Sequence, residues 1–392
     1  MTLDVAALRA ETPGCEHVIH LNNAGSSLQP RPVAEAVQSY LDDEVRGGGY
    51  ETADARRDEI DDFYDAVADL IGARPDEVAF LDSATRAWQM IFYSLDLRAG
   101  DQIITTTTEY HSNYVAYLHL AERRGIEIVV VPDAPSGEID IDALGNSISA
   151  RTRLISLNHV PTNGGLVNPA AAVGAVARAA GVPFLLDACQ SVGQLPTDVA
   201  QIGCAFLTAT GRKFLRGPRG TGFLYVSRTK LAEIDPVVID GHAAPWSSRD
   251  GYELQVDGRR FEVWEQHFAG KVGLAVAARY ARSVGPAASW QRIQDLASGL
   301  RQRLTAIPGV TVRDRGEVQG GIVTFTVDGV VCRDVSAALR RERINTSSPR
   351  VATARIDMED RGLEGLVRAS VHYFNTDEEL DALTSVVARL AS

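Results

Sequence analysis

The stretch ATGRKFLRGPRGTGFLYV, residues 209–226, places one lysine, Lys213, between a small polar run and a glycine-rich turn. The apolar run 223–226 follows the turn and predicts a short buried strand. Lys213 is therefore either an ordinary surface lysine or a lysine held out of water for chemistry, because lysine is rarely buried without a partner or a function. The segments around this stretch decide between the two interpretations.

The composition is that of a large, acidic, folded protein. The chain has 392 residues, of which 45% are hydrophobic and 23% charged, and its formal net charge is −12. This length suits two domains, and the apolar fraction is sufficient for a large core. The negative charge and the lack of a basic stripe argue against a nucleic acid as partner.

Cysteine usage and the N-terminal sequence predict a cytoplasmic protein. The four cysteines, Cys15, Cys189, Cys204 and Cys332, are widely spaced and form no CxxC pair, so we expect reduced thiols and neither a disulfide framework nor a metal site. Residues 1–14 include acidic residues and no long apolar run, which is unlike a signal peptide. No apolar run approaches the roughly 20 residues that span a bilayer, so we expect no membrane partner.

Strand-like and helix-like runs alternate between about residues 75 and 230. This alternation predicts crossover units, and hence a mostly parallel sheet with helices on both faces. In such sheets ligands lie at the carboxyl ends of the strands, where the polar residues of this chain also occur. The seven strand-like runs are residues 77–82, 101–107, 126–132, 153–160, 183–188, 204–210 and 221–227.

The pattern changes after about residue 255. Two long helices, at 271–284 and 290–304, are followed by strands and helices that predict a smaller α+β unit. We therefore expect a large domain at 20–250 and a small domain formed by 1–19 and 255–392. The segment 237–258, which is rich in Gly, Asp and Ser, is expected to be a loop between them.

A buried acid and a lysine carry the predicted chemistry. Asp187 follows three apolar residues, and Lys213 lies 26 residues downstream, about one strand–helix–strand step away. Most such aspartates are helix caps or loop residues. Together with a lysine, however, the carboxylate suits pyridoxal 5′-phosphate (PLP), because it keeps the pyridine nitrogen protonated while the lysine holds the aldehyde covalently.

Three further segments could complete a cofactor site. Residues 83–85, Ser-Ala-Thr, follow a strand at the start of a helix, where a phosphate can bind, although the same pattern is common in ordinary helix caps. Thr210 and Arg212 precede Lys213 and offer a hydroxyl and a guanidinium to the phosphate. His111 follows another strand and could stack on a flat ring or move protons.

The ordered set of motifs resembles the PLP-dependent, fold-type I, class V aminotransferase family, close to its cysteine desulfurase and isopenicillin N epimerase-like group. Each motif alone is weak, but their order and spacing over nearly the whole chain are specific. The resemblance implies a PLP-dependent transferase fold with a mostly parallel seven-stranded sheet and a smaller α+β C-terminal domain. The motifs are residues 20–33, 46–53, 84–86, 109–113, 159–169, 187–190, 210–213, 217–226 and 367–383.

The resemblance also implies roles for individual residues. Lys213 would bind PLP covalently, Asp187 would hold its pyridine nitrogen and His111 would stack on its ring. Gln190 would donate to the phenolic oxygen of the ring, and Arg368 would hold the substrate carboxylate. The resemblance further implies that Thr85, Thr210 and Arg212 bind the cofactor phosphate, that Thr162 or Asn163 lies near the cofactor, and that Asn23, Ala24 and Tyr50 bind the substrate. Ser83 and Ala84 are expected to bind the cofactor because of their place at the start of a helix.

Two departures from the family pattern affect the predicted function. The counterpart of the desulfurase loop, residues 344–358, contains no cysteine. Where relatives commonly have Gly-Thr-Pro, with a threonine that reaches the partner subunit's phosphate, this chain has Trp264-Glu265-Gln266. The family still implies a homodimer.

These observations lead to the hypothesis of a PLP-dependent enzyme acting on a small α-amino acid. We expect a C–S lyase that performs β-elimination on a cysteine derivative or S-conjugate, and not a persulfide-forming cysteine desulfurase. The alternatives are a class V aminotransferase, an amino-acid epimerase, and a decarboxylating or oxidatively deaminating PLP enzyme of secondary metabolism.

Two other classes of protein fit less well. A cofactor-binding regulator would be expected to include a DNA-binding module, for which this chain has no spare segment. A nucleotide-binding protein is disfavoured because GPRGTG, residues 217–222, precedes a strand instead of joining a strand to a helix.

Overall fold

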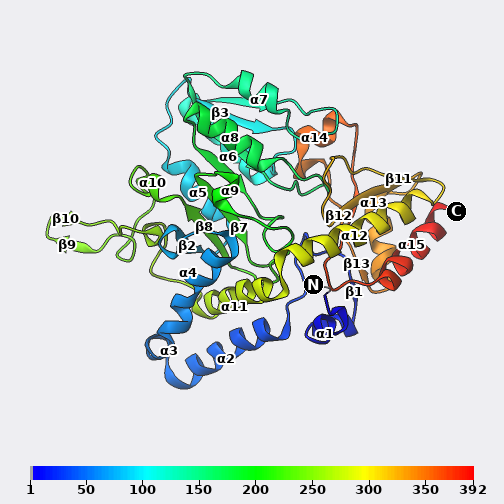
Figure 1. Cartoon of the computed structure of the whole chain (residues 1–392), viewed down its shortest axis with the longest axis horizontal. Helices are drawn as coiled ribbons and strands as arrows, with labels where there is room; N and C mark the ends of the chain where they lie inside the picture. Colours follow the sequence, from blue (N-terminus) through cyan, green and yellow to red (C-terminus); the bar gives the residue numbers. More distant parts are fainter. Residues whose placement is uncertain (1–2) are drawn as a thin grey trace.

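A seven-stranded sheet forms the centre of the larger part of the molecule (Figure 1). In the computed structural model, which describes residues 3–392, its strand order is β2-β8-β7-β6-β5-β3-β4. Strand β8 is antiparallel to both neighbours, and the other neighbouring pairs are parallel. This confirms the predicted mostly parallel sheet. The strands are β2 (Val78–Leu81), β3 (Gln102–Thr106), β4 (Glu127–Val131), β5 (Thr152–Asn158), β6 (Phe184–Asp187), β7 (Phe206–Thr210) and β8 (Gly222–Val226).

Helices cover both faces of this sheet because successive strand residues point to opposite sides. Ile103 and Leu185 join a core with helices α5 and α6, whereas Ile104 and Leu186 join a core with α4, α8 and α11. Strands buried on both faces need continuous apolar runs, as this sequence has. The helices of this part are α4 (Arg57–Ile71), α5 (Ala84–Ser94), α6 (His111–Arg124), α7 (Ile141–Ser147), α8 (Ala170–Ala180), α9 (Val199–Ile202), α10 (Arg228–Leu231) and α11 (Phe268–Val284).

The smaller part is an antiparallel sheet covered by helices, as predicted. Strands β11 (Val310–Val312), β12 (Ile322–Val327) and β14 (Val367–Ser370) form the sheet. Helices α12 (Pro286–Thr305), α13 (Cys332–Arg341) and α15 (Asp377–Ala391) contribute to one apolar core with it. Two short elements, η4 (Val351–Thr353) and α14 (Arg355–Asp360), lie between β13 (Ile344–Asn345) and β14.

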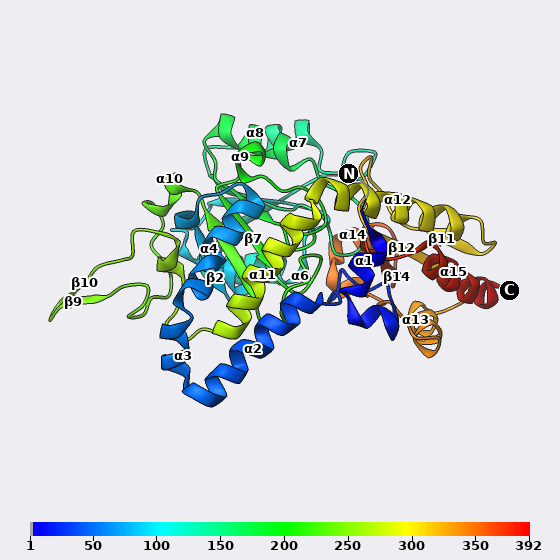
Figure 2. The same cartoon turned by 60° about the horizontal axis from the view of Figure 1, so that its bottom comes forward.

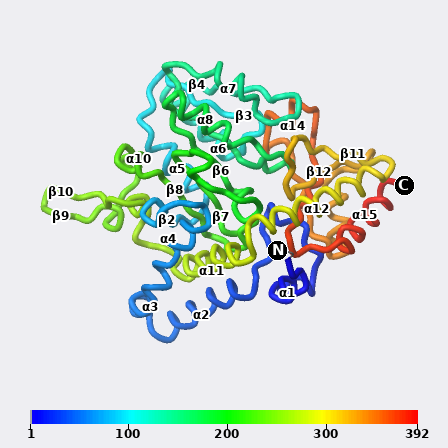
Figure 3. The backbone as a smooth tube through the Cα atoms, viewed as in Figure 1, coloured from blue at the N-terminus to red at the C-terminus, as the bar shows by residue number. Residues whose placement is uncertain are grey.

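The N-terminal segment returns to this smaller part. Strand β1 (Ile19–His20) pairs with β13, and Arg9 of α1 (Val5–Ala10) bonds to Glu379 of α15 at 2.9 Å. The tube in Figure 3 shows this blue segment beside the orange and red C-terminal elements. The short helix η1 (Pro13–Glu16) connects α1 to β1.

Helix α11 packs on the larger part, against α4 and α2 (Arg31–Gly47), as the turned view in Figure 2 shows. Its residues 274–278 belong to the core of the large sheet. The division into domains at 20–250 and 255–392 remains a prediction. Within residues 3–392, none of the helices combines the length and apolarity that crossing a membrane would require.

The segment predicted as a loop contains a hairpin. Strands β9 (Trp246–Ser248) and β10 (Gly251–Tyr252) pair antiparallel and extend away from the body, at the left of Figure 1. Their residues are mostly exposed, so periodicity from a buried face could not reveal them. The remaining short elements are α3 (Gly49–Ala55), η2 (Pro75–Glu77) and η3 (Gly258–Phe261).

Gly174 allows α8 to pack closely on α9, which gives a stability prediction. An alanine Cβ at Gly174 would overlap the carbonyl oxygen of Ile202. We expect Gly174→Ala to lower the free energy of unfolding by about 1–3 kcal/mol, measured by urea denaturation. The matched control is Gly145→Ala in α7, which meets no atom within 4 Å and should raise stability by about 0.5–1 kcal/mol. Equal effects of the two substitutions would contradict this packing.

Candidate active site

A cavity of about 280 Å³ lies where segments after the strands of the large sheet meet the smaller part. It brings together residues from segments that are far apart in the sequence. The predicted residues Ala24, His111, Thr162, Asn163, Arg212, Lys213 and Arg368 all line it. The other lining residues are Gly25, Tyr110, Ser347, Ser348, Pro349 and Thr353.

The amine of Lys213 differs from those of the other lysines because it has no acidic partner within 4 Å in the described chain. Lys230 and Lys271, which complete the lysines of the sequence, form ion pairs with glutamates. Lys213 is 8% exposed, and its Nζ lies 5.9 Å from the centre of the Tyr110 ring. Burial lowers the pKa of this amine. A lowered pKa favours the neutral form of the amine, which is the form that covalent binding of an aldehyde requires.

Arg216 anchors the loop that follows Lys213. Its φ is 62°, in the left-handed region that residues other than glycine rarely adopt. The buried guanidinium donates hydrogen bonds to the Leu28 carbonyl and to the hydroxyls of Tyr373 and Thr12, at 2.7–2.8 Å. These bonds hold the lysine loop against the N-terminal segment and the smaller part.

Asp187 ends strand β6 and is held by side chains of neighbouring elements. Its Oδ2 accepts hydrogen bonds from the amides of Asn113 and Asn158, both at 3.0 Å, and its Oδ1 accepts one from the Cys189 backbone at 3.0 Å. These donors fix the orientation of a buried carboxylate at the strand end. The arrangement suits a group that must meet one atom of a ligand.

Glu109 is a buried acid next to this carboxylate that sequence reasoning missed. Its Oε1 accepts a hydrogen bond at 3.1 Å from Asn113, the same amide that donates to Asp187. Its Oε2 accepts bonds from the hydroxyls of Thr105 and Tyr117. Burial raises the pKa of Glu109 to about 7. Its place at the start of the segment EYHSNY, residues 109–114, was the available signal.

Arg368 enters the cavity from strand β14 of the smaller part. Its Nη1 donates to the carbonyl and hydroxyl of Thr162 at 2.9 and 3.0 Å, and its Nε donates to the Ser347 hydroxyl at 3.0 Å. Burial lowers its pKa to about 10, so the group stays charged at neutral pH. A charged, oriented guanidinium in a cavity is well matched to a carboxylate.

Several buried polar atoms near the cavity lack partners in the described chain. They include Gln190 Oε1, His111 Nδ1 and Asn163 Oδ1. The Gln190 amide donates to the Ala24 carbonyl at 3.1 Å and lies 3.4 Å from the Thr162 hydroxyl. Thr162 and Asn163 both line the cavity, so the choice between them stays open. Unpartnered buried groups of this kind fit a polar ligand such as PLP.

The predicted phosphate-binding residues are divided between two places. Arg212 lines the cavity and donates to the Gly25 carbonyl at 2.5 Å. Ser83 caps α5, while Ala84 and Thr85 form its first turn. Thr210 ends β7 and donates to the Thr221 carbonyl at 3.3 Å. For the α5 residues and Thr210 the phosphate role remains a prediction, since the lining within residues 3–392 does not include them.

Two predicted substrate residues do not face this cavity in the described chain. Asn23 is buried, donates to the Ser370 carbonyl and accepts from the Ser27 hydroxyl. Its neighbour Asn22 instead lies beside Arg368, with Oδ1 3.5 Å from Nη2. Tyr50 lies on α3 and is 73% exposed.

The loop over the cavity offers hydroxyl groups. Ser347, Ser348 and Thr353 line it, whereas the lining within residues 3–392 includes no cysteine. Cys189 lies close to Asp187, and burial raises the pKa of its thiol. Cys204 belongs to the core of the large sheet, and Cys15 and Cys332 pack against the core of the smaller part.

The sequence profile of the aminotransferase class-V family matches residues 19–383. The chain belongs to this family. Class V aminotransferases are PLP-dependent, so the predicted cofactor and the prediction of a PLP-dependent enzyme are confirmed. The residues described above fit this group. The free amine of Lys213 and the unpartnered atoms of His111 and Asn163 belong to the cavity lining, whereas the lining within residues 3–392 does not include the carboxylate of Asp187 or the amide of Gln190.

Relatives extend the similarity over the whole chain. A protein of Methanothermobacter thermautotrophicus described as "Probable cysteine desulfurase" is 28% identical over 98% of this chain and 97% of its own. The apo structure of a cysteine desulfurase from Thermococcus onnurineus NA1 has a TM-score of 0.92 and 27% identity, covering 100% of this chain and 98% of that one. A C-DES mutant with glycine covalently linked to its PLP cofactor has a TM-score of 0.88 and 26% identity, covering 97% and 98%. These similarities confirm the predicted fold type.

The comparisons correct the sequence-based function. The hypothesis of a C–S lyase that is not a persulfide-forming cysteine desulfurase is wrong, because relatives matching end to end are described as cysteine desulfurases. The difference on which that hypothesis relied, the lack of a cysteine in residues 344–358, is confined to one loop.

Covalent labelling tests the role of Lys213. Borohydride reduction of the PLP-loaded protein, followed by peptide mapping, should place the pyridoxyl group on Lys213, because its amine is buried and free of acids. Lys213→Arg should lose the label, and Lys271→Arg, at the other buried lysine, should keep it. A label on Lys230 or Lys271 would rule out this assignment.

The raised pKa of Glu109 predicts a pH-dependent stability. Folding raises this pKa from an ordinary value of 4.5 to about 7, so the folded state binds the proton more tightly than the unfolded chain does. This contribution is fully present below pH 4.5 and is lost as the pH rises through 7. Between pH 4 and 8 the wild type should lose roughly 3 kcal/mol relative to Glu109→Gln, measured by urea denaturation at each pH. Parallel pH curves for the two proteins would contradict the prediction.

Proposed function

We propose that the protein is a cysteine desulfurase, which transfers the sulfur atom of L-cysteine to an acceptor thiol as a persulfide and releases L-alanine. The proposal has its main support in one cavity that joins the free amine of Lys213 to the guanidinium of Arg368, in a chain similar from end to end to cysteine desulfurases. The assignments of individual site residues are part of this proposal.

Arg368, Lys213 and Asp187 have different roles in the proposed reaction. Arg368 binds the α-carboxylate, and its bonds to Thr162 and Ser347 keep its planar group oriented. The amine of Lys213, whose pKa is lowered by burial, then removes the proton from Cα and returns it to another atom of the substrate. When bound, PLP supplies the electron sink that makes this proton acidic, and Asp187 maintains that sink by holding the ring nitrogen protonated.

The loop hydroxyls and the histidine shape the rest of the cavity. Ser347, Ser348 and Thr353 form one wall, and His111 with Tyr110 forms another. The ring centres of His111 and Tyr110 lie 4.3 Å apart. This aromatic wall suits a flat cofactor ring, and the small volume suits a short amino acid.

The identity of the products tests the reaction. With L-cysteine and excess thiol reductant, the PLP-loaded enzyme should form L-alanine and sulfide in equal amounts, while two thiols are oxidised to one disulfide. Mass spectrometry and a sulfide assay measure both products. Pyruvate and ammonia in place of alanine, or no turnover of L-cysteine, would refute the proposal.

Replacement of Arg368 tests substrate binding separately. Arg368→Gln should raise KM for L-cysteine by about tenfold or more, because a charge-assisted bond to the carboxylate is lost. Arg389→Gln, at an exposed arginine of α15, is the matched control and should leave KM unchanged. An unchanged KM in Arg368→Gln would show that another group holds the carboxylate.

We further propose that the protein is a homodimer in the cytoplasm. Exposed apolar residues lie on α2, α3, the β9–β10 hairpin and the segment 256–264, and Figure 1 draws α3 and the hairpin at the same end of the molecule. Monomers rarely leave so many large apolar side chains exposed in one region. The segment includes Trp264, which lies where relatives commonly have the Gly-Thr-Pro whose threonine reaches a partner's cofactor phosphate.

Light scattering tests the dimer. The wild type should show twice the chain mass of 42.3 kDa at micromolar concentration. Val45→Glu on α2 should shift the mass toward the monomer, because it places a charge in the proposed interface, while Val331→Glu, another exposed valine, should not. A monomeric wild-type protein with full activity would disprove it.

A further inference from the structure

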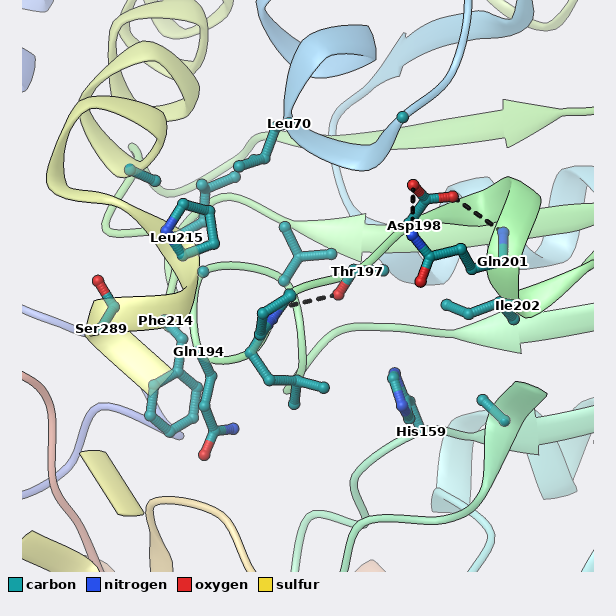
Figure 4. A pocket seen from close by; sticks show the side chains of 18 of the residues that line it. Leu70, His159, Gln194, Thr197, Asp198, Gln201, Ile202, Phe214, Leu215 and Ser289 are labelled. Atoms are coloured by element: carbon teal, nitrogen blue, oxygen red, sulfur yellow. Dashed lines mark hydrogen bonds between the residues drawn. The ribbon is translucent and has the colours of Figure 1, made fainter. Parts of the chain in front are cut away.

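The structure has a second cavity, of about 560 Å³, and Figure 4 shows side chains that line it. It is bounded by α4, the start of α8, α9, the α11–α12 junction and the loops that follow β6 and β7. Its lining shares no residue with that of the active-site cavity. A volume of this size is typical of small-molecule sites.

The ring of His159 faces this cavity without a partner. His159 is 6% exposed, and its Nδ1 has no hydrogen-bond partner among the described residues. Figure 4 shows the ring pointing from its backbone toward the middle of the lining side chains. Burial lowers its pKa to about 4, so at neutral pH the imidazole is uncharged and presents one N–H donor. A buried polar ring of this kind calls for a ligand or water.

The start of α8 adds one further donor. Residues 169–172 line the cavity, and the first turn of this 11-residue helix has no side-chain cap. The N–H groups of Ala170 and Ala172 donate to the carbonyls of Asn168 and Pro169, which leaves the N–H of Ala171 without a backbone partner among the described residues. The N-terminus of a helix also carries a partial positive charge, which favours an anion.

The lining contains two acids, Asp69 and Asp198, and two arginines, Arg216 and Arg282, and both acids already have partners. Asp69 pairs with Arg279 at 2.5 Å, and Asp198 accepts the backbone N–H groups that begin α9. Arg216 is 2% exposed and has only neutral acceptors and aromatic rings around it, with no carboxylate within 4 Å in the described chain. A buried cation without a counter-ion favours a negative ligand nearby.

We propose that this cavity binds a small organic carboxylate with an apolar body, its charged end toward His159 and the start of α8. Apolar side chains, including Leu70, Val192 and Phe214, provide the surface for the apolar body. The site goes beyond the proposed desulfurase reaction and does not depend on it.

The walls of this cavity are continuous with the active site. Phe214 directly follows Lys213, and the backbone N–H of His159 donates to the Asp187 carbonyl at 3.0 Å. A ligand in the cavity would therefore restrain the segments that hold both cofactor-binding residues, which gives the site a route to regulate the enzyme.

Calorimetric titration of the PLP-loaded enzyme with benzoate tests the proposal, with the uncharged benzamide as matched ligand. We expect saturable binding of benzoate and binding of benzamide at least about tenfold weaker. The titration is repeated in Arg368→Gln, which lacks the guanidinium proposed to hold carboxylates in the active site. Benzoate affinity should be unchanged there, which separates this site from the substrate site.

Two variants probe the cavity itself. His159→Phe keeps the ring and removes its nitrogens, and Ser289→Leu fills part of the space from α12. Each should weaken benzoate about tenfold or more, whereas Ser385→Leu, on the exposed face of α15, should not. Absence of saturable benzoate binding, equal binding of benzamide, loss of binding in Arg368→Gln, or unchanged affinity in both cavity variants would overturn the proposal.

Discussion

The site depends on one buried amine, that of Lys213, which has no carboxylate within 4 Å among residues 3–392. Lys213 lies in the loop after β7, where the large sheet meets the smaller part, and burial lowers the pKa of its side chain. An ion pair like that of Lys271 with Glu262 would favour the charged form and remove the reactivity. The architecture therefore has to exclude carboxylates from this amine while placing one, Asp187, nearby.

Asp187 is held near the lysine, but not paired with it, by its position at the end of a strand of the large sheet. Asp187 ends β6, and its oxygens are occupied by Asn113, Asn158 and the Cys189 backbone, which fixes its direction. The smaller part contributes the opposite charge, Arg368, on a strand of its own. Asp187 belongs to the large sheet and Arg368 to the sheet of the smaller part. The packing of the smaller part against the large sheet therefore sets the distance between the two side chains.

Much of this arrangement could be predicted from local sequence patterns. The seven strands, the buried acid and the lysine follow from apolar runs and from what stands at their ends. The choice between Asn22 and Asn23 could not be predicted, because it depends on how the segment bridges to Ser370 of β14. The acid at Glu109 was likewise hidden, since its burial arises from contacts with Thr105 and Tyr117 that no spacing rule encodes. The predicted function was wrong because the lack of a cysteine in residues 344–358 is one local difference, whereas the similarity to cysteine desulfurases covers the whole chain.

We propose that PLP lies between the amine of Lys213 and the carboxylate of Asp187. A crystal structure of the PLP-loaded protein tests this most directly. It should show the cofactor joined to Lys213 Nζ, with its ring nitrogen within hydrogen-bond distance of Asp187, about 3 Å, and its ring beside His111. A ring nitrogen that faces any other group, or a cofactor bound outside this cavity, would contradict the account.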